Sequence, residues 1–407
     1  TQIYSLIMYI LIILIGIFVG LEIPILTRII ENNERNVRKN LANIFTFDYI
    51  GGLIGSIAFP ILLFPKLGFI TTAFLVGSIN IITAVIIVFK YSKFIEKSKI
   101  IKITAIAILI VMLAFLFTGN MITDKIERGL YRDDVILSKQ TPYQKIVMTK
   151  HKDDLRLFLD GNLQFSSSDE YRYHEALVHI PMMYAKKHDR VLILGGGDGL
   201  AARELLKYED IKEIVLVDID KDMTDLCATD KQIAKLNNDS LKNEKVQVIN
   251  EDGYMFVQEN ENKFDVIIID FPDPNNESLN KLYTNVFYNY IKANLNENGV
   301  MVCQSTSPYY AKKSFWCINK TIKSQFESVI PYHLQVPTFG EWGFNIAFNG
   351  ENKREKLQVE TQYLNEDNID SMFNFGKDEM LDMNLIEEND MFKPTLITYY
   401  NEEVQNW

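Results

Sequence analysis

The chain has 407 residues, enough for two or three domains, and a formal net charge of -11. This acidic balance argues against nucleic acid as a partner, because binding phosphates requires a basic face. The three cysteines, Cys227, Cys303 and Cys317, fit neither a metal-binding spacing nor a disulfide framework, and we expect no metal.

The first 120 residues are predominantly apolar and contain four stretches long enough for membrane helices. A spanning helix needs about 20 mainly apolar residues. The sequence therefore predicts a transmembrane helical region over 1–120, with about four spans in the lipid bilayer. Because residue 1 is Thr, we expect that further membrane segments can precede it. The four stretches are 3–21, 49–64, 69–89 and 103–118.

The remaining chain is polar and has two different patterns. Residues 130–168 alternate in polarity and predict a small antiparallel β subdomain. Residues 169–350 contain short apolar segments separated by helical patterns, which is typical of a parallel sheet covered on both faces. We therefore predict a Rossmann-like α/β domain. Residues 351–407 are acidic and weakly patterned, and we expect them to form a C-terminal appendage.

The first two predicted parallel strands end in residues suited to a nucleoside. Ligands of open α/β sheets bind beyond the carboxyl ends of the strands. The turn "GGGDG" contains Gly195, Gly197 and Gly199, a spacing that favours adenosyl-sulfonium ligands over dinucleotides, although a tight turn alone is an alternative. After the second strand, Asp218 is placed to accept both ribose hydroxyls, whereas Asp220 is expected to cap the next helix.

The third and fourth strands also end in carboxylates. Asp252, followed by Gly253, can cap a helix or accept a hydrogen bond from an adenine amino group. Asp270 and Asp273 follow the apolar run "VIII" closely enough to repel each other, which raises the pKa of one of them. Such a pair needs a cation between its members or serves as a base. With Asp198, these positions predict a pocket for a cationic nucleoside and a cationic partner.

Several motifs together resemble those of the spermidine synthases, or polyamine aminopropyltransferases. They are "TPYQKIVM", "LDGNLQFSSSDEYRYHEAL", "VLILGGGDGLAARELLK", "LVDID", "NEDG" and "DFPDP", within about 130–350. The N-terminal stretches "GLEIPILTRI" and "FDYIGGLIGSIAFP" are similar to the membrane-anchored bacterial branch of that family.

The resemblance implies a role for each matching position. Asp270 would be the catalytic proton acceptor, and the acceptor amine would lie between it and Asp273. Substrate-binding residues would be Tyr173, His174, Asp198 and Asp273. Nucleoside-binding residues would be Gln144, Gly195, Gly197, Asp218, Asp252 and Gly253. The resemblance also implies a homodimer or higher homo-oligomer.

Three departures from the usual family pattern affect these roles. Asp218 stands where soluble members usually have Glu, which shortens the reach of the carboxylate by one methylene. Phe339 stands where they usually have a substrate-contacting Tyr, so the identity of the acceptor amine stays open. The loop "DFPDPNNESL" differs from the usual "DSTDP" form.

The expected reaction moves the aminopropyl group of decarboxylated S-adenosylmethionine to putrescine, giving spermidine and 5'-methylthioadenosine. Decarboxylated S-adenosylmethionine carries a sulfonium and an ammonium, putrescine is a dication, and a pocket of aspartates attracts both. One alternative is an S-adenosylmethionine-dependent small-amine methyltransferase. Another is a membrane sensor that binds polyamine without turnover.

The sequence predicts a multi-pass protein of the cell membrane. Both proposed substrates are made in the cytoplasm, which favours a cytoplasmic catalytic domain. By the positive-inside rule, however, the lysines within 90–102 and the basic residues within 35–39 place the two loops that contain them in the cytoplasm. With four true spans, this orientation would put the catalytic domain outside the cell. The two expectations agree if 103–118 is interfacial or re-entrant, since it is short for a span.

Overall fold

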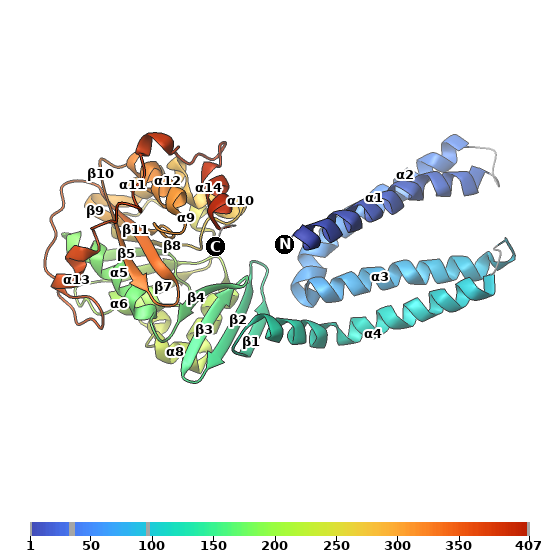
Figure 1. Cartoon of the computed structure of the whole chain (residues 1–407), viewed down its shortest axis with the longest axis horizontal. Coiled ribbons are helices and arrows are strands. Elements are labelled where there is room, and N and C mark those ends of the chain that lie inside the picture. The colour runs from blue at the N-terminus through green and yellow to red at the C-terminus, as the bar shows by residue number, and fades with distance from the viewer. Residues whose placement is uncertain (1, 32–36, 95–97, 405–407) are drawn as a thin grey trace. The chain divides into compact units, whose positions relative to one another are not determined.

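The computed structural model describes residues 2–31, 37–94 and 98–404. The chain divides into two compact units, Thr1–Lys125 and Ile126–Trp407. Figure 1 shows long helices in the first unit and a mixed α/β arrangement in the second.

Four long helices build the first unit. They are α1 (Gln2–Glu31), α2 (Val37–Ala58), α3 (Phe64–Lys90) and α4 (Ser98–Leu130), with a π-helical turn, η1 (Phe59–Leu63), between α2 and α3. Figure 1 shows α1 beside α2 and α3 beside α4. The rings of Phe74 and Phe115 stack between α3 and α4, with centroids 5.1 Å apart.

These helices are long and apolar enough to cross a membrane. Large apolar side chains on them face outward, including Phe18 (71% exposed), Leu53 (61%) and Phe117 (83%). An apolar surface of this extent is unusual for a soluble protein and is suited to lipid. The four candidate spans are Ser5–Arg28, Leu41–Leu63, Lys66–Lys90 and Ser98–Gly119.

The fourth apolar stretch lies in a longer helix than the sequence pattern indicated. The expected segment 103–118 lies within α4, whose candidate span has 22 residues. Lys99 and Lys102 made the stretch look short, but long lysine side chains can extend toward the polar interface while their helix continues. This stretch is therefore long enough to span a bilayer, and its interfacial or re-entrant placement stays a prediction.

The second unit begins with a four-stranded antiparallel sheet in the order β1-β2-β3-β4. A turn at Asp160 (φ 50°) and Gly161 (φ 85°) joins β3 to β4, and this Asp-Gly pair is typical of a tight hairpin with positive φ at both residues. The strands are β1 (Asp134–Gln140), β2 (Lys145–His151), β3 (Asp154–Leu159) and β4 (Asn162–Ser166).

A seven-stranded sheet forms the centre of the second unit, in the order β10-β11-β9-β8-β5-β6-β7. Strands β5 to β9 are parallel and correspond to the short apolar segments of the predicted parallel sheet, whereas β11 and β10 add an antiparallel hairpin at one edge. The strand order reverses between β5 and β8, where a ligand crevice is expected. The strands are β5 (Arg190–Gly195), β6 (Glu213–Val217), β7 (Val246–Ile249), β8 (Phe264–Asp270), β9 (Leu295–Gln304), β10 (Ser328–Val336) and β11 (Gly340–Phe348).

Helices cover both faces of this sheet and produce two hydrophobic clusters. On β5, Ile193 belongs to one cluster, and Leu192 and Leu194 belong to the other. A strand buried on both faces is apolar at every position, which explains the continuous apolar runs in the sequence. The helices are α5 (Glu170–Tyr184), α6 (Leu200–Leu205), α7 (Lys221–Thr229), α8 (Lys231–Leu236), α9 (Gly253–Glu259), α10 (Glu277–Asn280), α11 (Asn285–Asn294), α12 (Lys312–Lys323), α13 (Glu366–Ser371) and α14 (Thr395–Val404).

The C-terminal residues, which the sequence predicted as an acidic appendage, pack against the sheet domain. Ile369 is buried in one hydrophobic cluster, and Leu396 is buried in the other. The indole nitrogen of Trp316 donates a hydrogen bond of 2.7 Å to the carbonyl of Glu379. The apolar residues here lie in short elements and irregular segments, so no regular periodicity revealed their burial.

Candidate active site

Asp270 ends β8 beside the glycine-rich turn that follows β5. Gly195 is the parallel neighbour of Asp270 in the sheet register. The backbone of Gly195 has φ 84°, and a Cβ atom there would collide with the carbonyl oxygen of Asp270. Only glycine fits at this position, and because Gly195 has no side chain the turn can lie against the backbone of Asp270.

The Asp270 carboxylate is buried and hydrogen bonded. The Tyr173 hydroxyl donates to its Oδ1 atom over 2.5 Å. Burial raises the pKa of Asp270 to about 6, and the negative charge of Asp198 acts in the same direction, whereas His174 and Tyr173 oppose the shift. A carboxylate with this pKa is ionised at neutral pH and has more affinity for a proton than an exposed aspartate.

Asp273 lies in the same buried region but has different partners. The Tyr400 hydroxyl donates to its Oδ2 atom over 2.9 Å, and the Gln304 amide donates to Oδ1 over 3.4 Å. Burial raises the pKa of Asp273 to about 6, despite the hydrogen bonds from Tyr400 and Gln304. Two carboxylates with raised pKa values thus flank the end of β8, as expected of a site that attracts cations.

His174 supplies a positive charge next to these acids. Its Nδ1 atom lies 2.8 Å from Oε2 of Glu170, and the Arg203 guanidinium donates to Oε1 of the same carboxylate over 2.7 Å. Burial lowers the pKa of His174, but Glu170, together with Asp198 and Asp270, raises it to about 9. The imidazole is therefore protonated at neutral pH and offsets part of the negative charge.

Asp198 is buried at the start of α6, near His174. Its Oδ1 atom accepts a hydrogen bond of 2.8 Å from the backbone nitrogen of Leu200. Burial raises the pKa of Asp198, and Glu170 adds to the shift, whereas His174 lowers it. Of the predicted substrate-binding residues, Tyr173, His174, Asp198 and Asp273 all interact electrostatically with Asp270 or with one of its neighbours.

Asp218 ties the end of β6 to the glycine-rich turn. Its Oδ2 atom accepts from the backbone nitrogen of Gly197 over 3.1 Å, and its Oδ1 atom accepts from the backbone nitrogen of Asp220 over 2.8 Å. A Cβ atom at Gly197 would lie 2.5 Å from Oδ2. Burial, with the charges of Asp220 and Asp198, raises the pKa of Asp218 to about 6.

Gln144 contacts Asp220 rather than Asp218. This contact joins the small antiparallel sheet to the carboxyl end of β6. The Gln144 side-chain amide donates to Oδ2 of Asp220 over 2.9 Å, and the Thr141 hydroxyl donates to the same atom over 2.7 Å. Asp220 also caps α7 by accepting from the backbone nitrogen of Asp222, which confirms the predicted capping role.

Asp252 caps α9 and pairs with a lysine. Its Oδ1 atom accepts from the backbone nitrogen of Tyr254 over 2.9 Å, and its Oδ2 atom forms an ion pair with Lys281. A Cβ atom at Gly253 would lie 2.9 Å from the Phe271 ring. The structure therefore supports the capping alternative for Asp252, and its contact with an adenine stays a prediction.

An aromatic wall formed by Phe339 and Trp342 lies beside the carboxylates. The Phe339 ring is 6.3 Å from that of Tyr173 and 5.3 Å from that of Trp342. The Trp342 indole donates to Oε1 of Gln304 over 3.3 Å. Gln304 and Tyr400 were not among the predicted site residues. The position of Gln304 at the end of β9 could have identified it, whereas no local signal marks Tyr400.

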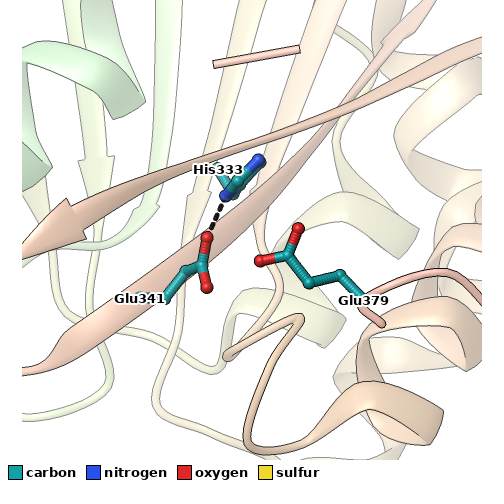
Figure 2. Close-up of side chains that lie close together, drawn as sticks. All are labelled: His333, Glu341 and Glu379. Carbon is teal, nitrogen blue, oxygen red and sulfur yellow. Dashed lines mark hydrogen bonds and ion pairs between the residues drawn. The ribbon is translucent and has the colours of Figure 1, made fainter. Parts of the chain in front are cut away.

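A second titratable cluster contains His333, Glu341 and Glu379, which point toward one another in Figure 2. One imidazole nitrogen and two carboxylate oxygens lie within 4.8 Å of one another. His333 hydrogen bonds to Glu341, and its Nε2 atom donates to the carbonyl of Asn374 over 3.0 Å. Burial and the neighbouring Glu379 carboxylate raise the pKa of Glu341. The cluster links the β10–β11 hairpin to the C-terminal segment.

Comparison with known proteins identifies the family. The chain is 42% identical over 401 residues to the polyamine aminopropyltransferase of Leptospira interrogans, covering 97% of this chain and 79% of the relative. The chain belongs to the polyamine aminopropyltransferase family. It is also 39% identical to the polyamine aminopropyltransferase of Oceanobacillus iheyensis over 98% of this chain and 79% of that relative. Residues 170–359 match the spermine/spermidine synthase domain.

Solved structures agree with the family assignment of this enzyme. A spermidine synthase in complex with the transition state analogue AdoDATO has a TM-score of 0.57 and 28% identity, over 62% of this chain and 89% of that one. The spermidine synthase from Thermotoga maritima has a TM-score of 0.56 and 28% identity, over 62% and 88% of the two chains. The enzyme therefore has the Rossmann-type α/β fold of the spermidine synthases.

Proposed function

We propose that this aminopropyltransferase moves the aminopropyl group of decarboxylated S-adenosylmethionine to putrescine, giving spermidine and 5'-methylthioadenosine. The observation that carries this proposal is the pair Asp270 and Asp273, both buried, both with a pKa of about 6, at the end of β8. A dicationic amine offsets the cost of keeping both carboxylates ionised in a buried region.

The donor is chosen by charge. Asp198, Asp218 and Asp270 are buried acids around the glycine-rich turn. These acids would repel the carboxylate of S-adenosylmethionine. The decarboxylated form carries only positive charges on its side chain, and the acids attract it. In this proposal, Asp218 and the turn at Gly195 and Gly197 bind the nucleoside, with Gln144, Asp252 and Gly253 around it.

The reaction requires a base because an alkylammonium ion has no lone pair for attack. Asp270 takes one proton from the amine of putrescine, while Tyr173 holds the Asp270 carboxylate in place. The free amine then attacks the carbon next to sulfur. A C–N bond forms, the C–S bond breaks, and its electron pair neutralises the sulfonium to a thioether. Because the sulfonium is already a good leaving group, we propose that the step needs no Lewis acid.

In this proposal, Asp273 contacts the same amine as Asp270 and fixes the direction from which that amine attacks. Orientation of the amine in line with the C–S bond contributes to the rate along with the base. In this proposal, the aromatic wall of Phe339 and Trp342 contacts the methylene chain of putrescine. The hydroxyl that soluble relatives offer at the position of Phe339 is missing, so other groups must position the amine.

Product analysis tests the proposal. Purified protein is incubated with putrescine and either decarboxylated S-adenosylmethionine or S-adenosylmethionine, and the nucleoside products are separated by chromatography. We expect 5'-methylthioadenosine with the first donor and no turnover with the second. S-adenosylhomocysteine and methylated amine would indicate a methyltransferase, and binding of putrescine without any product would indicate a sensor.

We also propose that the four N-terminal helices cross the cell membrane and that the catalytic unit faces the cytoplasm. The apolar length of the helices supports the first part, and the cytoplasmic origin of both substrates supports the second. The lysines within 90–102 favour the opposite orientation by the positive-inside rule, so direct labelling is the appropriate test.

A further inference from the structure

Asp273 receives a hydrogen bond from a residue outside the domain that defines the family. Tyr400 lies in α14, whereas the spermine/spermidine synthase domain matches residues 170–359. The Tyr400 hydroxyl donates to Oδ2 of Asp273 over 2.9 Å, across 127 positions of the chain. Burial and the Asp273 charge raise the pKa of Tyr400, so this hydroxyl keeps its proton and stays a donor.

Two contacts hold α14 against the catalytic domain and so place Tyr400. The carboxylate of Glu403 accepts from the backbone nitrogen of Lys313 over 2.7 Å and from the Ser314 hydroxyl over 2.8 Å, at the start of α12. Leu396 is fully buried in a hydrophobic cluster of the sheet domain. The helix is therefore anchored on both sides of Tyr400, and its hydroxyl is directed by packing that does not depend on Asp273.

Asn389 fixes the chain just before α14. Its side-chain nitrogen donates to the carbonyl of Tyr283 over 3.0 Å, and its side-chain oxygen accepts from the backbone nitrogen of Leu396 over 3.2 Å. The Tyr283 hydroxyl in turn donates to the carbonyl of Pro272 over 2.9 Å, next to Asp273. The C-terminal segment and the loop after β8 are thus connected through buried polar groups, which are costly to break.

The hydrogen bonds of Asp273 are unequal. Oδ2 has the 2.9 Å bond from Tyr400 and Oδ1 has the 3.4 Å contact with Gln304, while the Thr306 side chain makes a smaller contribution to lowering the pKa of this carboxylate. A bond of 3.4 Å is long for an amide donor. The Tyr400 contact therefore fixes the rotation of the carboxylate and leaves Oδ1 as the oxygen better able to accept from an ammonium group.

We propose that Tyr400 is a positioning residue for the acceptor amine, acting through Asp273, and that the C-terminal segment is thereby part of the acceptor-binding site. The inference rests on the proposed function, in which Asp273 binds the amine of putrescine. It assigns to α14 a hydroxyl that contacts Asp273, in a site where Phe339 offers none. The donor half of the site, around Gly197 and Asp218, has no contact with Tyr400 in the hydrogen bonds of the described residues.

The test compares Tyr400→Phe with Tyr399→Phe in the full chain. Tyr399 is the matched control, because it lies in the same helix and, within the described part of the chain, its hydroxyl has a single long hydrogen bond, 3.4 Å from the backbone nitrogen of Glu387. We expect Tyr400→Phe to raise KM for putrescine about tenfold, since a hydrogen bond to a charged group is lost. KM for the donor should stay within about twofold of wild type, and Tyr399→Phe should change neither constant.

The pH profile separates positioning from a general structural role. The Tyr400 hydrogen bond lowers the pKa of Asp273, so its removal raises that pKa. The acid limb of kcat/KM for putrescine should then move to higher pH in Tyr400→Phe and stay in place in Tyr399→Phe. In an Asp273→Ala background, which removes the acceptor of the Tyr400 hydroxyl, Tyr400→Phe should have no further effect on KM for putrescine, because the two residues act through one contact.

Two outcomes would overturn the inference while leaving the proposed function intact: Tyr400→Phe behaves like Tyr399→Phe, or it lowers kcat and the melting temperature with both KM values and the acid limb unchanged. If wild type itself forms no 5'-methylthioadenosine from putrescine, the proposed function fails and the inference fails with it. A third outcome that would overturn the inference is additivity of Tyr400→Phe and Asp273→Ala, because the two residues would then not be coupled.

Discussion

Replacing Asp270 by Asn removes the proposed base while preserving the shape of the site. The side-chain oxygen of Asn can still accept from the Tyr173 hydroxyl, which donates to Oδ1 of Asp270 over 2.5 Å in the native enzyme. The amide cannot accept a proton from the amine at neutral pH. The substitution therefore tests proton transfer more directly than a truncation to Ala, which would open a cavity in the buried site.

The size of the effect follows from the state of Asp270. With a pKa of about 6, this carboxylate is mostly ionised at pH 7.5 and is available as a base. Loss of a positioned base costs about 10²–10⁴ in rate. Each factor of ten corresponds to about 1.4 kcal/mol, so we expect Asp270→Asn to raise the activation free energy by about 3–5 kcal/mol.

The assay measures formation of 5'-methylthioadenosine under saturating donor and putrescine, and calorimetry with 5'-methylthioadenosine checks that nucleoside binding survives. Asp265→Asn is the matched control. Asp265 is a buried carboxylate near the opposite end of β8, where it accepts from the Asn296 side chain over 2.8 Å. We expect the control to keep its turnover number. If Asp270→Asn kept more than half of wild-type turnover, Asp270 could not be the base.

Four further predictions address the rest of the enzyme. The value of kcat/KM should fall below about pH 6, because Asp270 and Asp273 with pKa values of about 6 become neutral there and lose their attraction for the amine; a flat profile from pH 5 to 7 would contradict this. Gly197→Ala should raise KM for the donor at least about tenfold, because its Cβ atom would lie 2.5 Å from Oδ2 of Asp218, whereas Gly51→Ala, at a position with open space around it, should have no effect. Incubation with EDTA should leave turnover unchanged; a loss that Zn²⁺ restores would instead indicate an ion at His333, Glu341 and Glu379. A cysteine at the exposed turn residue Asp153 should resist a membrane-impermeant thiol reagent in intact cells, and rapid labelling would show that the catalytic unit faces outward. The three native cysteines are buried and should give little background labelling.

Much of the catalytic sheet could be predicted from local sequence. A strand buried on both faces must be apolar throughout, so runs such as "VIIID" mark both the strand and the residue at which it ends. Since parallel strands share one carboxyl edge, Asp218 and Asp270 could be assigned to the same site without coordinates. The four apolar helices could also be predicted, because a long apolar stretch identifies such a helix without any knowledge of its tertiary contacts.

The partners of these residues could not be predicted in the same way. Gln144 was predicted to bind a nucleoside, but no local signal predicted that its amide donates to Asp220, through a contact between the small sheet and the end of β6. The protonated state of His174 depends on Glu170, Asp198 and Asp270, which come from different parts of the chain. Charge interactions of this kind depend on distance in space, which sequence spacing does not provide.

The sequence by itself determined the membrane-suited helices, the parallel strands and the carboxylates at their ends, because each depends on local periodicity and composition. Only the tertiary structure decided that the residues after 350 pack against the catalytic sheet and that Tyr400 reaches Asp273. That segment is acidic and irregular, and its few apolar anchors show no period. Its place was decided by buried contacts such as those of Leu396 and Asn389, which form only after the sheet and its helices are assembled.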